Sequence, residues 1–232
     1  MNPREHVLAG VTARLEEHSS LATRQSKVDG RLSMHGRNTV PARGKKSHAE
    51  LIELFTAMLT AVQGSVTRVE SLRQVPPAVS DYLELNTLGK EVCLDEEAEQ
   101  LGIPWETNAN LEFVAWVPKR SISVGITSCY GAVAETGSLV ACSSGNHAIT
   151  MNFLAETNIV ILDSRNLVGV YEEIWDELRS ESGMQLPRDL TLISGPSCTG
   201  DIEMVLEFGA HGPKRLHVII VGDAVAEYEP VA

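Results

Sequence analysis

The stretch from Ile193 to Val221 constrains the fold of this 232-residue chain more than any other segment. It joins two short apolar runs, Leu190–Ser194 and Leu216–Val221, through a polar loop that contains glycine. Such runs are typical of buried strands. Between them, helical spacing is found at Ile202, Val205 and Leu206. Thr199 is a candidate N-cap for this helix, and Gly209 is a candidate residue for its end. The pattern predicts a strand–loop–helix–turn–strand unit whose two strands are parallel neighbours.

The loop Gly195–Asp201 would then lie at the carboxyl end of a strand, where open α/β sheets bind ligands. Gly195, Ser197 and Thr199 are its candidate binding residues, because a glycine-rich loop before a helix can hold an anion. Asp201 adds negative charge at that helix start and opposes a phosphate. The alternative is a helix cap with a tight turn and no ligand.

A carboxylate stands in a second apolar stretch, where Glu135 interrupts the run from Ala132 to Cys142. Burial can raise the pKa of a carboxyl group toward the range useful for acid–base catalysis. The alternative is an exposed hairpin turn, which has the same sequence signature. His211, in a predicted loop, can titrate near neutral pH, but a turn-fixing hydrogen bond is an equal alternative.

Both stretches resemble the lactate-utilisation protein C family, or LUD domain. In that family a G-I-T…A-E-T-G-[ST]-L block precedes S-G-P-S-x-T-A-D-I-E…G-x-H-G-P…L-H-V-I-[LV]-V. The first block is matched here by residues 125–127 and 134–139, and the second by residues 194–197, 199, 201–203, 209, 211–213 and 216–219. Cys198 stands where the family usually has a basic residue, and residues 153–158 replace a leucine-proline-histidine stretch.

The resemblance implies an α/β fold, a three-layer α/β/α sandwich similar to the ribose-phosphate isomerase, glucosamine-phosphate deaminase and CoA-transferase group. It implies a component of L-lactate utilisation that acts with iron–sulfur partner subunits in the oxidation of L-lactate to pyruvate, with no cofactor in this chain. Carried onto this sequence, the catalytic candidates are Glu135, Asp201 and His211, and the substrate-binding candidates are Thr136, Gly137, Ser138, Gly195, Ser197 and Thr199.

Two other functions stay open. One is an independent enzyme on a small carboxylate, a sugar phosphate or a CoA ester, with Glu135 as base or nucleophile. The other is a non-enzymatic assembly module. Fold likeness alone cannot choose among them, because related folds host many activities.

Charge divides the chain. Residues 1–48 hold nine Lys/Arg and four Asp/Glu, a net charge of +5, whereas the remainder carries −17. An acidic body repels phosphates and argues against a nucleic acid partner. The basic arm is expected to pack on the acidic body of its own or a neighbouring subunit, as in a homo-oligomer, or on another acidic partner, and a disordered arm is the remaining alternative.

The remaining composition predicts a cytoplasmic protein. No apolar run approaches the length of a membrane span, and the first ten residues lack a signal-peptide core. The four cysteines form no C-x-x-C pair, so no metal site is predicted and free thiols are expected. Cys129 and Cys198 fall in the two motif loops and would approach each other if those loops meet.

Alternating elements predict the layered α/β class independently of the resemblance. We expect a basic N-terminal helix and arm over residues 1–46, and a LUD-type α/β domain over residues 47–232. Within the first part, Arg4–His18 is a predicted helix and Leu21–Gly44 a predicted loop. In the second part the predicted helices are 47–61, 76–85, 95–100 and 167–179, and the predicted strands are 65–69, 91–94, 111–117, 121–127, 138–142 and 159–163.

Overall fold

The computed structural model describes residues 2–34, 36–37, 39–116, 122–144, 149–182, 186–200 and 206–222. The chain divides into two compact units, Met1–Val40 and Pro41–Ala232. The domain limit placed after residue 46 stays a prediction. In the described ranges, no helix is both long and apolar enough to cross a bilayer.

The N-terminal unit holds two helices, α1 (Pro3–His18) and α2 (Leu21–Met34). The predicted first helix is confirmed, and Asn2 with Glu5 forms a capping box at its start. The loop predicted from Leu21 onward is wrong as far as Met34, because this stretch is helical. Its Leu, Ala, Arg, Gln, Lys and Met residues are good helix formers, and none of the residues of α2 is buried. Local propensity therefore favours a helix there even though large apolar residues are few.

The second unit is built on a parallel sheet whose strand order is β1-β12-β7-β4-β2-β3. Its strands are β1 (Ser65–Val69), β12 (Arg215–Val221), β7 (Ala155–Asp163), β4 (Ile122–Ser128), β2 (Glu91–Leu94) and β3 (Glu112–Phe113). The α/β class predicted from the sequence is confirmed. Residues 117–121 of the predicted strands around Pro118 lie outside the described residues.

One face of this sheet is covered by α4 (Val75–Leu85), which opens with prolines at its first turn as predicted. Val75 and Val79 of this helix pack on Val124, Ile159 and Ile219 of the sheet in one apolar cluster. The shorter elements of the chain are η1 (Ala42–Gly44), η2 (Leu72–Gln74), α5 (Glu96–Gln100), η3 (Trp105–Thr107), α6 (Met151–Leu154) and η4 (Ser164–Asn166).

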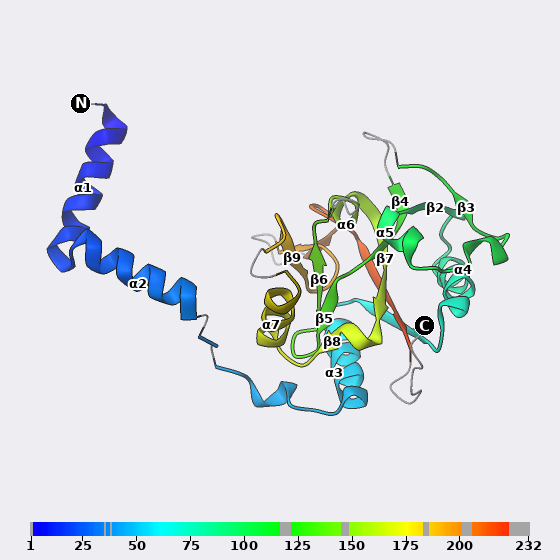
Figure 1. Ribbon diagram of the computed structural model, residues 1–232. Coiled ribbons are helices and arrows are strands. Elements are labelled where there is room, and N and C mark those ends of the chain that lie inside the picture. The colour runs from blue at the N-terminus through cyan, green and yellow to red at the C-terminus, as the bar shows by residue number, and fades with distance from the viewer. Residues whose placement is uncertain are drawn as a thin grey trace. The chain divides into compact units, whose positions relative to one another are not determined.

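The other face is covered by α3 (His48–Ala61) and by a second, smaller sheet. Ser47 and Glu50 form the predicted capping box of α3. The small sheet has the order β8-β5-β6-β9. Its strands are β8 (Leu167–Val168), β5 (Gly131–Val133), β6 (Ser138–Cys142) and β9 (Leu190–Ile193). Helix α7 (Tyr171–Ser182) packs outside this sheet, so α4 and α7 flank the unit on opposite sides in Figure 1.

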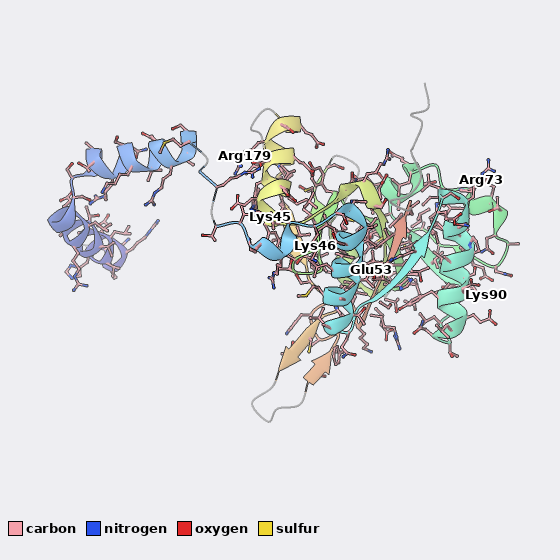
Figure 2. The ribbon with its side chains drawn as sticks, turned by 90° about the horizontal axis from the view of Figure 1, so that it is seen from below. Lys45, Lys46, Glu53, Arg73, Lys90 and Arg179 are labelled. Atoms are coloured by element: carbon pink, nitrogen blue, oxygen red, sulfur yellow. The ribbon has the colours of Figure 1, made fainter. Side chains whose placement is uncertain are left out.

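The predicted unit at residues 190–221 is wrong in its middle and in its pairing. Its two strands, β9 and β12, are present, but they belong to different sheets. Between them lies an antiparallel hairpin of β10 (Cys198–Gly200) and β11 (Leu206–Phe208), which extends from the body in Figure 2. Three apolar residues within five positions fit a helix only weakly, because so short a helix needs a packing partner. Residues 201–205 lie outside the described residues.

Candidate functional site

The first motif block forms the turn between β5 and β6. Gly137 in this turn has a φ of +64°, and an added Cβ would lie 2.6 Å from the backbone nitrogen of Leu59. The turn therefore needs glycine both for its conformation and for its close approach to the C-terminal end of α3. This contact fixes where the neighbouring Glu135 and Thr136 lie.

Glu135 is buried, with only 4% of its surface exposed. Its backbone N–H donates to the carbonyl of Gly169, 3.2 Å away. The guanidinium Nε of Arg43 lies 3.5 Å from Glu135 Oε2, and among the described residues this oxygen has no hydrogen-bond partner. A carboxylate in such a place keeps an acceptor oxygen free while a positive charge offsets part of its burial cost. The alternative of an exposed hairpin turn is therefore wrong in one respect: the segment is a hairpin turn, but Glu135 in it is buried.

Four hydroxyl groups form a cluster beside this turn. Thr136 Oγ1 lies 2.7 Å from Ser138 Oγ, and the hydroxyl of Tyr171 lies 2.8 Å from each of them. Ser138 Oγ also lies 2.5 Å from Ser194 Oγ. Since every hydroxyl can both donate and accept, each member of the cluster has at least one partner within it. The Ser138–Ser194 contact joins the first motif block to the second.

The second block packs on the same end of α3. Gly195 has a φ of +102°, and an added Cβ would lie 2.7 Å from a methyl group of Val62. Next to it, the N–H of Ser197 donates to the carbonyl of Pro213, and the N–H of Gly209 donates to the carbonyl of Ser197. These bonds tie the Ser-Gly-Pro-Ser loop to the His-Gly-Pro turn. The two motif blocks are therefore one structural unit.

The second block lines a small pocket of about 230 Å³, called here the amino-end pocket. Its polar lining residues are Asn152, Ser194, Ser197 and His211, and its apolar ones include Phe153 and Leu216. Asn152 lies on α6 just before β7, and Leu216 is at the start of β12, so the pocket is at the amino ends of these parallel strands. The expectation that this loop lies at the carboxyl ends of the main-sheet strands is therefore wrong, because β9 belongs to the small sheet and not to the main sheet.

The structure brings together some of the predicted site residues. Gly195, Ser197 and His211 line the amino-end pocket, and His211 is exposed. Thr136 and Ser138 reach it only through Ser194, and Glu135 and Gly137 do not line it. Thr199 lies on β10, exposed and opposite Glu207 of β11. The predicted Asp201 lies outside the described residues.

A second pocket, missed by the sequence prediction, lies at the opposite ends of the main-sheet strands, their carboxyl ends. This carboxyl-end pocket measures about 570 Å³. Ser128, Cys129 and Tyr130 reach it from the end of β4, and the carboxylates of Glu97, Glu177 and Glu181 come from α5 and α7. Tyr130 donates to Glu181 at 2.8 Å, and Ser128 donates to Glu97 at 3.1 Å. The paired acidic residues Glu177 and Glu181, one helical turn apart, were the available sequence signal.

Charge and burial raise the pKa values of several groups in and beside the carboxyl-end pocket. Burial, reinforced by the neighbouring Glu181, raises the pKa of Glu177. Burial likewise raises the pKa of the Cys129 thiol, and burial together with Glu97 and Glu181 raises that of Cys142 to about 11. These thiols stay protonated at neutral pH and are poor nucleophiles. Cys129 and Cys198 form no disulfide, and within the described ranges no three His, Cys, Asp or Glu side chains are placed so that they could hold one metal ion.

Comparison with known proteins agrees with the motif blocks. The LUD domain family matches residues 52–221. The lactate utilization protein C of Bacillus velezensis is 31% identical over 180 residues, which are 76% of this chain and 73% of the relative. The protein of the same name from Halalkalibacterium halodurans is 36% identical over 195 residues, which are 77% and 83% of the two chains.

A solved structure shows the same fold. The crystal structure of a DUF162 family protein from Deinococcus radiodurans has a TM-score of 0.56 and 20% identity, and it covers 76% of this chain and 99% of that one. At this identity the likeness shows the fold and no activity. The match over most of the second unit, together with relatives above 30% identity, shows that this chain belongs to the LUD domain family.

Proposed function

We propose that this chain is a component of L-lactate utilisation that acts with iron–sulfur partner subunits in the oxidation of L-lactate to pyruvate. The proposal is supported by its relatives, several of which are named lactate utilization protein C. The observation that carries it is the Ser138–Ser194 contact, which unites the two motif blocks directly behind the amino-end pocket.

The amino-end pocket suits a small hydroxy acid. It is compact, and among the described residues no carboxylate is part of its lining, so none of them opposes an anion there. The hydroxyls of Ser194 and Ser197 and the imidazole of His211 can donate hydrogen bonds to a carboxylate. Oxidation of the acid releases two electrons and two protons, and among the described lining residues the imidazole of His211 is the candidate general base for one of these protons.

The electrons must leave through the partners. The four cysteines of this chain lie on β2, after β4, on β6 and on β10, and burial keeps two of them protonated. Such thiols do not fit the converging thiolate set of an iron–sulfur cluster. The role proposed for this chain is therefore to bind substrate or to complete the complex.

Co-purification tests the proposal. The tagged full chain, isolated from its native cells grown on L-lactate, is expected to bring down iron–sulfur proteins together with L-lactate-dependent pyruvate formation. The variant His211→Gln is expected to keep the partners and lose most of the turnover. Recovery of the wild-type chain without any iron–sulfur protein, or lactate oxidation unchanged in cells that lack the chain, would contradict it.

The buried Glu135 favours a second candidate, an independent enzyme on a small carboxylate, a sugar phosphate or a CoA ester. Its Oε2, which is ion-paired with Arg43 but accepts no hydrogen bond from the described residues, is placed as a base or nucleophile would be. Here the isolated chain would turn over a member of such a substrate panel, and Glu135→Gln would abolish turnover without unfolding the protein. Failure of every substrate in the panel leaves the lactate proposal as the better one.

A further inference from the structure

The two edges of the main sheet differ in a way that the proposed function does not explain. At one edge, β3 has only two residues, Glu112 and Phe113. At the other edge, all five residues of β1 are in register with β12. Short edge strands are one means by which proteins avoid pairing with other chains, whereas a regular five-residue edge is open to it.

The register fixes which backbone groups of β1 point outward. The N–H of Gly222 donates to the carbonyl of Val69, so Val69 and its alternate residues Thr67 and Ser65 face β12. Val66 and Arg68 therefore direct their N–H and C=O groups away from the sheet. At the next outward position, Glu70, the N–H already donates to Gln74 Oε1 at 2.7 Å. Among the described residues no strand pairs with β1 on this side, so Val66 and Arg68 are the positions open to pairing.

These two positions are complementary to themselves. If a second copy of β1 runs antiparallel about a twofold axis through Thr67, each Val66 stands opposite Arg68 of the other copy. The twofold axis produces two such Val66–Arg68 pairs. Each is a hydrogen-bonded pair with two backbone hydrogen bonds, so four backbone hydrogen bonds cross the axis. No register slip is needed, because the outward residues are spaced symmetrically about Thr67.

The surface beside β1 also favours a second copy of this chain as the partner. A groove of about 660 Å³ runs between β1 and α4 and includes Pro77, Ala78 and Leu85 in its lining. Leu85, beside Pro77 and Ala78, is 85% exposed, so the groove has an apolar side that is open to solvent. A second copy brought against the edge would cover this apolar surface.

Charge points to the same occupant. The groove lining holds one basic residue, Arg68, and one acidic residue, Asp81, so its net charge is zero. The chain beyond residue 48 carries a net charge of −17, so most surfaces of the body repel one another. Arg68 is also held on its own subunit by Glu53 of α3, labelled in Figure 2, at 2.7 Å. The edge can therefore face its own copy without like-charge repulsion.

We propose that β1 is the dimerisation edge of this protein, and that two copies join their main sheets through antiparallel β1–β1 pairing centred on Thr67. This interface is independent of the substrate pocket and of the proposed role in lactate oxidation.

Charge placed at the twofold axis tests the proposal on the full chain. The wild type is expected to be a dimer by light scattering and sedimentation. Thr67→Lys and Thr67→Asp each put two like charges opposite one another, and each is expected to weaken dimerisation at least about tenfold. An equimolar mixture of the two variants is expected to restore the dimer, which misfolded variants could not do.

The matched control is Thr191→Lys on β9, the edge strand of the small sheet, which is expected to leave the dimer intact. A monomeric wild type would overturn the proposal, as would a Thr67→Lys chain as dimeric as the wild type. Dissociation by Thr191→Lys alone would instead assign the interface to β9 and equally overturn it.

Discussion

The two ends of the main sheet present opposite chemistry. At the amino ends, the pocket beside the two motif blocks is lined by hydroxyls, an amide and an imidazole, and none of its lining residues in the described ranges is a carboxylate. At the carboxyl ends, three glutamates surround a larger pocket. Open α/β sheets usually bind ligands at the carboxyl edge. In this protein, the distribution of charge favours an anionic substrate at the other end.

The difference shows what the motif residues do. Gly137 and Gly195 let two turns approach the C-terminal end of α3, and Ser138 links those turns. Gly137 and Ser138 of the family signature therefore fix the position of the two turns, whereas Ser194, Ser197 and His211 of the second block line the amino-end pocket. Variants at the two ends can break or sharpen this comparison.

The largest effect is expected from Gly137→Ala at the motif turn. The added Cβ would clash with the backbone of α3, and the residue would be held at a positive φ. We expect a loss of about 3 kcal/mol or more in the free energy of unfolding, measured by denaturant titration. Gly89→Ala is the control, because an added Cβ at Gly89 meets no atom within 4 Å. Equal stability of the two variants would show that the turn can move away from α3.

The next largest effect concerns pH and His217 on β12. Burial lowers the pKa of His217 to about 4, and its ring stacks on Tyr82 with the ring centres 3.9 Å apart. As the pH falls, the folded state therefore takes up this proton at a lower pH than the unfolded state, whose histidine has a pKa near the ordinary value. Stability is fully present above the unfolded pKa and is lost as the pH falls toward the folded pKa.

Between pH 7 and 5 we expect this residue to remove about 2 kcal/mol from the free energy of unfolding. The variant His217→Gln should be less stable at pH 7 but should lack this part of the pH dependence. Denaturant titrations of both proteins at the two pH values measure the difference. Parallel pH profiles would mean that His217 is not held in its neutral form.

Local sequence signals predicted the frame of the fold. The capping box of Ser47 and Glu50 gave the start of α3, and the prolines before Ala78 gave the start of α4. The hairpin β10–β11 was missed because three apolar residues at helical spacing cannot exclude a strand over so short a segment. Pairing between sheets is a tertiary property, so the separation of β9 from β12 was equally hidden.

The site was predicted only in part for the same reason. Glu135 was identified, but its burial depends on Gly169 and Arg43, which are distant in the sequence. The hydroxyl cluster needs Tyr171 from α7 in addition to the motif residues. The carboxyl-end pocket assembles carboxylates from α5 and α7 around the end of β4, and no single segment contains that pattern.

Exchanging the charge of the two pockets tests which one binds the anion. Ser197→Asp places a carboxylate in the amino-end pocket, and we expect it to weaken L-lactate binding at least about tenfold in the assembled complex, measured by calorimetry. Glu177→Gln removes a carboxylate from the other pocket and should leave that affinity unchanged. Tighter binding by Glu177→Gln, with no effect of Ser197→Asp, would move the proposed substrate site to the carboxyl end.

The smallest effect is expected from the same Glu177→Gln change on stability. Because burial and Glu181 raise the pKa of Glu177, its ionised form costs stability at neutral pH, and this cost disappears as the pH falls below the unfolded pKa. The side chain is partly exposed and screened by solvent, so we expect a gain of no more than about 0.5 kcal/mol at pH 7. The gain should shrink toward pH 4 and with added salt. This direction is opposite to that of His217, since one end of the sheet holds an acid that resists ionisation and the other a base that resists protonation. A loss of stability at pH 7 would mean that the Glu177 carboxylate is paired, and that the carboxyl-end pocket is less repulsive to anions than its lining implies.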